Sequence, residues 1–98
     1  EKSIVEEKGV VSEEVAALLA ENSANLMEAD FGIGLTGVAG PDGGTEDNPV
    51  GTICYSVVGR GKVRSFRKIF GGDRIAIRTR GSQAALFSLL QILTDKLD

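Results

Sequence analysis

Residues 37–49 constrain the fold of this 98-residue chain more than any other segment. Four glycines and two prolines crowd these positions, a density that neither a helix nor a strand tolerates. Apolar segments of strand-like composition lie on both sides, at 31–36 and 50–58. A structureless connection of this length is uncommon in a small domain unless it has a function. The sequence therefore predicts two strands joined by a functional loop, with a loop that needs glycine only for its turns as the alternative.

Two helical segments precede the first strand. Residues 2–8 resemble the end of a helix that stops at Gly9. Ser12 is a good cap for a second helix, because Glu13 and Glu14 follow it at the positive end of the helix dipole. Apolar and small residues then recur at helical spacing and predict one inward face. The predicted face consists of Val15, Leu18, Leu19, Asn22, Leu26 and Met27.

The strand before the loop alternates between large side chains and glycine. Gly32 and Gly34 share one face, which lets another element approach the backbone closely. The strand at 50–58 is apolar on both faces, which predicts a central position in the sheet. The turn at 59–61 predicts that residues 62–70 run back antiparallel to it.

The chain closes with a long helix. Asp73 is its predicted cap, and the helix is expected to run to about residue 97. The predicted buried stripe consists of Leu86, Leu89, Leu90, Leu93 and Leu97. The order of elements predicts a single domain over residues 1–98, a three-layer α/β/α sandwich with a mixed sheet.

The net charge of -3 conceals an uneven distribution of charge. Residues 1–50 contain two lysines against eleven acids, a balance of -9. Residues 51–98 contain nine bases against three aspartates, a balance of +6. A basic half on an acidic protein indicates an anionic ligand or an acidic partner surface. A solvated surface that pairs with the acidic half is the alternative.

Composition also narrows the chemistry. The chain contains no histidine, which excludes a Ser-His-Asp triad and a histidine-containing metal site within it. Its one cysteine, Cys54, cannot form an internal disulfide, and neither a long apolar run nor a leader-like start is present. We therefore expect a cytoplasmic protein. Exposed loop acids such as Asp42, Glu46 and Asp47 usually only solvate a turn, so we expect no metal and no cofactor.

The letters GIGLTG at 32–37 satisfy the pattern G-x-G-x-x-G. That fingerprint binds a dinucleotide only where it leaves a strand and opens a helix. Here the first two glycines lie inside the predicted strand, and a glycine-rich loop follows. We therefore reject a dinucleotide-binding function.

Two features favour an anion site. Seven of the 13 glycines lie between Gly32 and Gly51, where backbone N–H groups can point at an anion or a developing oxyanion. Arg74 opens the last helix and Arg78 follows one turn later on the same face, an arrangement that suits phosphate. Surface arginines that bind the acidic half explain the second feature equally well.

A longer motif resembles a known family. The letters GLTGVAGPDGGTEDNPVGT at 34–52 resemble the signature of the CinA C-terminal domain family. The resemblance continues in FGGDR at 70–74, in Arg78, and in GVVS at 9–12 before a helix, so it covers nearly the whole chain. The family comprises competence- and damage-inducible proteins and includes nicotinamide-nucleotide amidohydrolases.

The resemblance implies hydrolysis of nicotinamide mononucleotide to nicotinate mononucleotide and ammonia, in pyridine nucleotide recycling. A serine activated by a lysine is the implied nucleophile. Thr36 matches a threonine or serine that lines the family's active site, and Arg74 and Arg78 match as anion contacts. The backbone of the loop would position the substrate or stabilise charge at Gly37, Ala39, Gly40, Gly43 and Gly44. We expect a small-molecule nucleotide as the ligand and a homo-oligomeric assembly.

The chain departs from the family in one respect. The family's serine lies in a Glu-Ser-Cys-Thr-Gly-Gly-like motif upstream of the segments found here, and its lysine follows that motif. Neither has a counterpart in this sequence. We therefore expect a domain that lacks its N-terminal elements and is inactive by itself.

Two other functions stay open. A non-catalytic module that binds a nucleotide or a protein through the basic stretch at 60–80 would fit the family's link to competence and DNA damage. Nucleic-acid binding is supported by eight bases between Arg60 and Arg80. Only Phe66 and Phe70 offer stacking there, and the isoelectric point is about 4.9, so we do not favour it.

Overall fold

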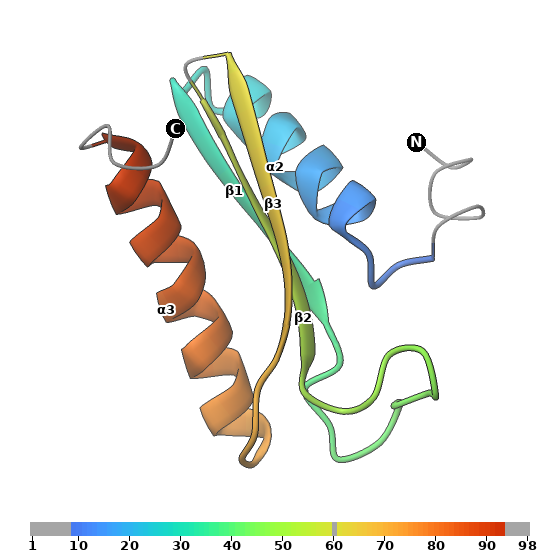
Figure 1. Cartoon of the computed structure of the whole chain (residues 1–98). Coiled ribbons are helices and arrows are strands. Elements are labelled where there is room, and N and C mark those ends of the chain that lie inside the picture. Colours follow the sequence, from blue (N-terminus) through green and yellow to red (C-terminus); the bar gives the residue numbers. More distant parts are fainter. Residues whose placement is uncertain (1–8, 60, 94–98) are drawn as a thin grey trace.

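The protein is a sandwich of helix, sheet and helix (Figure 1). The computed structural model describes residues 9–59 and 61–93. Helix α2 (Glu13–Leu26) covers one face of the sheet and helix α3 (Arg74–Leu93) covers the other. The predicted three layers are confirmed, whereas the helix predicted at 2–8 lies outside the described residues. Within the described residues, neither helix is long and apolar enough to cross a membrane.

Within residues 9–59 and 61–93, the sheet has three strands in the order β1-β2-β3. They are β1 (Phe31–Gly37), β2 (Thr52–Gly59) and β3 (Lys62–Ile69), and both pairings are antiparallel. The prediction of a mixed sheet is therefore wrong for the described residues. A parallel pair of strands needs a long crossover connection, whereas these strands are joined by a loop and a tight turn. The central position of β2 is confirmed by its almost complete burial.

The glycine face of β1 receives α2, as predicted. A Cβ atom added to Gly32 would lie 2.2 Å from the carbonyl oxygen of Ala20, and one added to Gly34 would lie 2.2 Å from that of Ala16. These distances are far below van der Waals contact, so only glycine allows the helix to lie this close to the strand.

The predicted inward face of α2 is correct only in part. Val15 is buried, but its companions against the sheet are Ala16 and Ala20. The other large residues of the predicted face are mostly solvent-exposed: Leu19 by 44%, Leu26 by 84% and Met27 by 73%. A helix this close to the strand has room for alanine but not for leucine.

The predicted buried stripe of α3 is wrong. Leu86, Leu90 and Leu93 are 60%, 56% and 43% exposed, Leu89 is half-buried, and Leu97 lies outside the described residues. The inward face instead carries a mixture of small and branched side chains: Ile77, Gly81, Ala85, Ser88 and Ile92. The leucines do share a face, but the helix is rotated so that Gly81 meets Ile53 of β2.

Both predicted helix caps are confirmed. The Ser12 hydroxyl accepts a hydrogen bond from the Val15 amide at 3.2 Å. The Asp73 carboxylate accepts one from the Ala76 amide at 2.9 Å. The second cap fixes the start of α3 directly after β3, so the first turns of α3 lie at the same end of the sheet as the glycine-rich loop (Figure 1).

Candidate functional site

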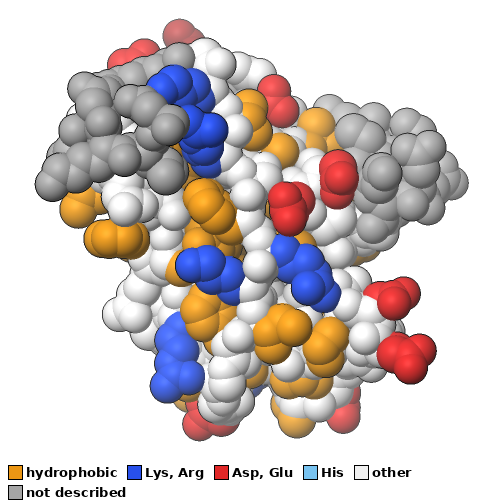
Figure 2. Space-filling model, in the orientation of Figure 1, with side chains coloured by type: hydrophobic (Ala, Val, Ile, Leu, Met, Phe, Trp, Pro, Cys, Tyr) orange, Lys and Arg blue, Asp and Glu red, His pale blue; other side chains and the backbone are white. Residues whose placement is uncertain are grey.

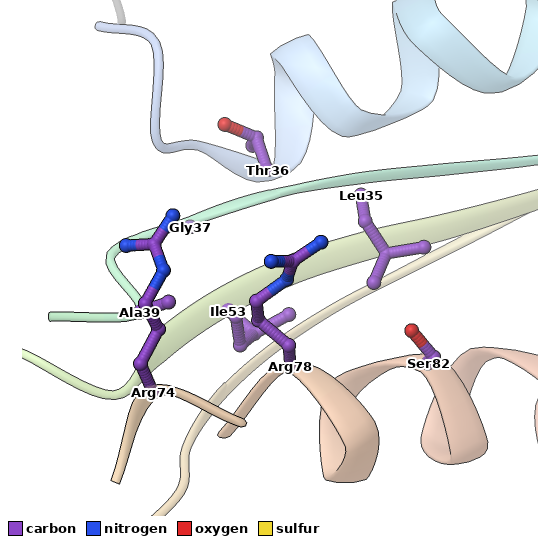
Figure 3. A pocket seen from close by; sticks show the side chains of 8 residues that line it. All are labelled: Leu35, Thr36, Gly37, Ala39, Ile53, Arg74, Arg78 and Ser82. Atoms are coloured by element: carbon purple, nitrogen blue, oxygen red, sulfur yellow. The ribbon is translucent and has the colours of Figure 1, made fainter. Parts of the chain in front are cut away.

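A cavity of about 300 Å³ opens between the end of β1 and the first turns of α3 (Figure 3). Leu35, Ala39 and Ile53 give it apolar walls, while Arg74 and Arg78 bring positive charge. The described residues that line it are Leu35, Thr36, Gly37, Ala39, Ile53, Arg74, Arg78 and Ser82. The cavity thus brings together five of the eight site residues that the sequence proposed: Thr36, Gly37, Ala39, Arg74 and Arg78.

Arg74 connects α3 to the glycine-rich loop. Its Nη1 donates a hydrogen bond to the carbonyl oxygen of Gly40 at 2.9 Å. Gly40 has a φ of +83°, a left-handed conformation that glycine adopts at little cost. Arg74 therefore holds the loop in a conformation that most other residues would resist.

Arg78 follows one turn later, and its side chain makes no hydrogen bond or ion pair with the described part of the chain. Its guanidinium group points from α3 toward β1, in the same direction as that of Arg74 (Figure 3). No Asp or Glu is among the described residues that line the cavity. The positive charge of Arg78 is therefore available to an anionic ligand.

Thr36 lies at the rim of the cavity, but its side chain turns to the other face of β1. Its hydroxyl donates a hydrogen bond to the carbonyl oxygen of Val10 at 2.9 Å. Figure 3 shows this hydroxyl directed away from the two guanidinium groups. In this arrangement Thr36 fixes the segment before α2, and its supporting role in catalysis stays a prediction.

The proposed glycines lie at different distances from the cavity. Gly37 lines it and has no room for a side chain, because a Cβ atom would lie 2.5 Å from Cδ1 of Ile53. Gly43 and Gly44 are exposed and do not line it. Gly44 instead lies against the backbone of Val50. Only the first part of the glycine-rich segment thus faces the cavity, and the rest forms turns.

Further hydrogen bonds hold the loop in place. The Gly51 amide donates to the Val38 carbonyl at 2.7 Å and closes the base of the loop. Arg67 of β3 donates to the Asp47 carbonyl at 2.7 Å. Together with Arg74, this contact ties the loop at two points to opposite faces of the sheet.

Comparison with known proteins shows the family to which this chain belongs. Residues 1–93 match the sequence pattern of the CinA C-terminal domain. The chain belongs to the CinA C-terminal domain family. The resemblance read from the sequence is therefore confirmed.

The relatives are longer than this chain. A CinA-like protein of Leptospira biflexa is 40% identical over 97 residues, which is 98% of this chain and 23% of the relative. One from Gemmatimonas aurantiaca is 47% identical over 78 residues, which is 80% of this chain and 18% of the relative. The chain thus spans about a quarter or less of the length of these curated relatives.

Solved structures agree with the fold. A crystal structure of a CinA superfamily protein from Escherichia coli matches with a TM-score of 0.87 at 32% identity, covering 94% of this chain and 54% of that one. One from Klebsiella pneumoniae matches with a TM-score of 0.89 at 27% identity, covering 97% and 59%. The fold is therefore shared over nearly all of this chain and over little more than half of those proteins.

Sequence reasoning missed three of the residues that line the site in this CinA-family chain: Leu35, Ile53 and Ser82. Leu35 and Ile53 lie on the sheet face opposite the glycines, as strand alternation implies. Ser82 lies one helical turn after Arg78, so the spacing that related Arg74 to Arg78 would also have identified it.

Several bases of this CinA-family chain donate to backbone carbonyls. Arg67 reaches Asp47, Arg74 reaches Gly40, and Arg80 reaches Gly71. Figure 2 shows Lys and Arg side chains scattered among exposed hydrophobic ones on the face that it presents. The arginines of the basic stretch at 60–80 therefore act partly as structural residues that connect separate segments of the backbone.

Proposed function

We propose that this chain supplies part of an amidohydrolase site that deamidates nicotinamide mononucleotide within a whole CinA-family domain. The observation that carries the proposal is the cavity, which joins apolar walls, an unbonded guanidinium group and the start of a glycine-rich loop. Ligand sites are usually of this kind, mostly apolar with a few convergent polar groups. A flat pyridine ring with a charged phosphate tail suits this cavity.

The cavity offers a role for each part of such a ligand. Leu35 and Ile53 provide an apolar surface for the pyridine ring. The amide of Ala39 makes no hydrogen bond within the described residues, so it can donate to the carboxamide oxygen as that oxygen becomes negative. Arg78 then faces the anionic end of the ligand.

The nucleophile is proposed to come from a part of the family domain outside this chain. Among the described residues that line the cavity, Thr36 and Ser82 supply the only hydroxyl groups, and none is a lysine. A serine hydroxyl would attack the carboxamide carbon while a lysine takes its proton and passes it to the departing ammonia. Water would then hydrolyse the acyl-enzyme to nicotinate mononucleotide. The reaction needs no cofactor and fits a cytoplasmic enzyme.

The test compares residues 1–98 with a longer protein that contains the whole family domain. Ammonia release from nicotinamide mononucleotide is measured, with nicotinate mononucleotide identified by chromatography. We expect turnover by the longer protein and none by residues 1–98. Turnover by residues 1–98 would show that the nucleophile is misassigned. If the longer protein released no ammonia from nicotinamide mononucleotide, the proposed reaction would be refuted.

A non-catalytic binding module is the second candidate. The observation in its favour is that no hydroxyl group pairs with a general base in the part of the lining that the structure describes. Calorimetry separates the two functions, because a binding module holds nicotinamide mononucleotide in the longer protein without releasing ammonia. An enzyme does both.

A further inference from the structure

We propose that one side of α3 is the surface on which the rest of the family domain packs in a longer protein, through a helix with an apolar face. We call this side the outer row of α3. Its members follow one another at intervals of three or four positions: Ile75, Thr79, Ser82, Leu86, Leu90 and Leu93. This docking surface does not depend on which reaction the domain catalyses.

The outer row is too apolar for a face that stays in water. Ile75 is 76% exposed and Leu86 is 60% exposed, and no charged residue belongs to the row as the structure describes it. The exposed positions of α2, by contrast, include Glu14 and Glu21. A helix that faces solvent normally carries charged residues on that side, whereas contiguous exposed apolar side chains mark an interaction surface.

The shape of the outer row fits another helix. Residues three and four positions apart are neighbours on one side of an α-helix, so the row runs along the length of α3. A hollow of about 410 Å³ is lined by Ile75 and Leu86 and, between them, by the shorter side chains of Thr79 and Ser82. Helices pack by inserting side chains of one into the gaps between side chains of the other. A large apolar side chain of the facing helix would therefore fill this hollow.

The length of the relatives identifies what occupies the row. The solved CinA-family structures share this fold over little more than half of their length. The remaining part of such a protein is expected to pack on the shared part, because helices and sheets bury their apolar faces against one another. Among the described elements, α3 carries the most large exposed apolar side chains. We therefore assign the outer row to that remaining part.

Packing on the outer row would also complete the cavity. Arg78 and Ser82 line both the hollow on α3 and the cavity between β1 and α3. A helix seated on the row would lie beside the cavity and form its outer wall. A nucleophile supplied from outside this chain would have to arrive on the same side.

The experiment measures how fast a maleimide labels an introduced cysteine in the longer protein and in residues 1–98. Leu86→Cys probes the outer row. Phe87→Cys is the matched control, because both residues are 60% exposed and adjacent helical positions point in different directions. In the longer protein we expect Leu86→Cys to react at least about 30-fold more slowly than Phe87→Cys. In residues 1–98 the two rates should agree within about 3-fold. Mass spectrometry of the peptide that contains position 86 or 87 separates this labelling from that of Cys54.

Two results would overturn the assignment. One is equal labelling of Leu86→Cys and Phe87→Cys in the longer protein. The other is labelling of Leu86→Cys in residues 1–98 that is slow at high protein concentration and fast after dilution, since a second copy of the chain would then occupy the row. The labelling involves no substrate, so it decides the docking surface whether or not the longer protein releases ammonia from nicotinamide mononucleotide.

Discussion

The two faces of the sheet hold their helices in different ways. On the α2 face, Gly32 and Gly34 let the helix backbone lie almost against the strand. On the α3 face, large side chains such as Ile53 and Tyr55 set the distance, and Tyr55 stacks on Phe66 with ring centroids 4.9 Å apart. Backbone-to-backbone contact leaves no free volume, whereas a layer of side chains leaves space wherever that layer ends.

The cavity lies where the layer of side chains ends. Leu35 and Ile53 are the last large side chains of β1 and β2 toward the loop on this face of the sheet. On the other face, Thr52, Cys54 and Ser56 are small and fully buried. The close-packed face thus contributes stability, while the looser face provides the site.

The largest effect is expected from a side chain at Gly34, which tests whether α2 lies almost against β1. A Cβ atom there would lie 2.2 Å from the Ala16 carbonyl oxygen and 2.6 Å from the Ala20 nitrogen, both backbone atoms that cannot rotate away. Gly34→Val should therefore cost about 4 kcal/mol or more of unfolding free energy, measured by urea titration. Gly71→Ala is the control with open space around it and should change stability by less than about 0.5 kcal/mol. A tolerated valine at Gly34 would mean that α2 does not lie this close.

A pair of truncations on α3 tests which of its faces is inward. Ile77 is 1% exposed and belongs to the core, whereas Leu86 is 60% exposed. In residues 1–98, Ile77→Ala should cost about 3 kcal/mol and Leu86→Ala less than about 1 kcal/mol by the same titration. The reverse order would restore the leucine stripe as the buried face.

The two faces of α3 show where prediction of the fold from sequence fails, and the helix caps show where it succeeds. The caps at Ser12 and Asp73 and the close approach at the β1 glycines depend on local chemistry, so the sequence predicts them. The rotation of α3 depends on the partner surface. Apolar residues recur at helical spacing on two faces of α3. The face that packs on the sheet is the one whose small residue, Gly81, fits over Ile53. Size and hydrophobicity alone favour the wrong face.

The site was partly predictable for the same reason. The motif identified Gly37, Ala39, Arg74 and Arg78, which line the cavity. Thr36 lies two residues after Gly34 in β1, so its side chain points to the glycine face, where its hydroxyl bonds to Val10. The hydrogen bond that commits Arg74 to the loop joins segments 34 residues apart, and no local pattern predicts such a contact.

Matched arginine variants can sharpen the comparison at the loop. In the longer protein, Arg74→Ala should lower kcat for nicotinamide mononucleotide about 10-fold, because it frees the cavity side of the loop. Arg67→Ala removes a similar bond to Asp47 on the α2 side, and we expect it to change kcat less than about 2-fold. Steady-state kinetics measures both. Equal losses would mean that the loop acts as one unit and that the two faces are not separate.

The smallest expected effect concerns the close-packed face. Burial raises the pKa of the Cys54 thiol, Arg67 opposes this rise, and Glu13 and Glu14 add to it. The folded protein therefore keeps its proton at a pH where the unfolded chain releases it. Because the folded state then binds more protons, stability is fully present below the ordinary thiol pKa and falls as the pH rises above it.

The consequence is a small loss of stability in mild alkali that depends on Cys54 alone. At pH 8.5, where about half of the thiols in the unfolded chain are ionised, the loss should be about 0.4 kcal/mol. Urea titrations at pH 7 and pH 8.5 on the unaltered chain and on Cys54→Ala measure it as the difference between their two pH dependences, which cancels all other titrating groups. Identical pH dependences would show that the thiol ionises as readily in the fold as in water. The α2 face would then be less tightly closed than its glycine contacts require.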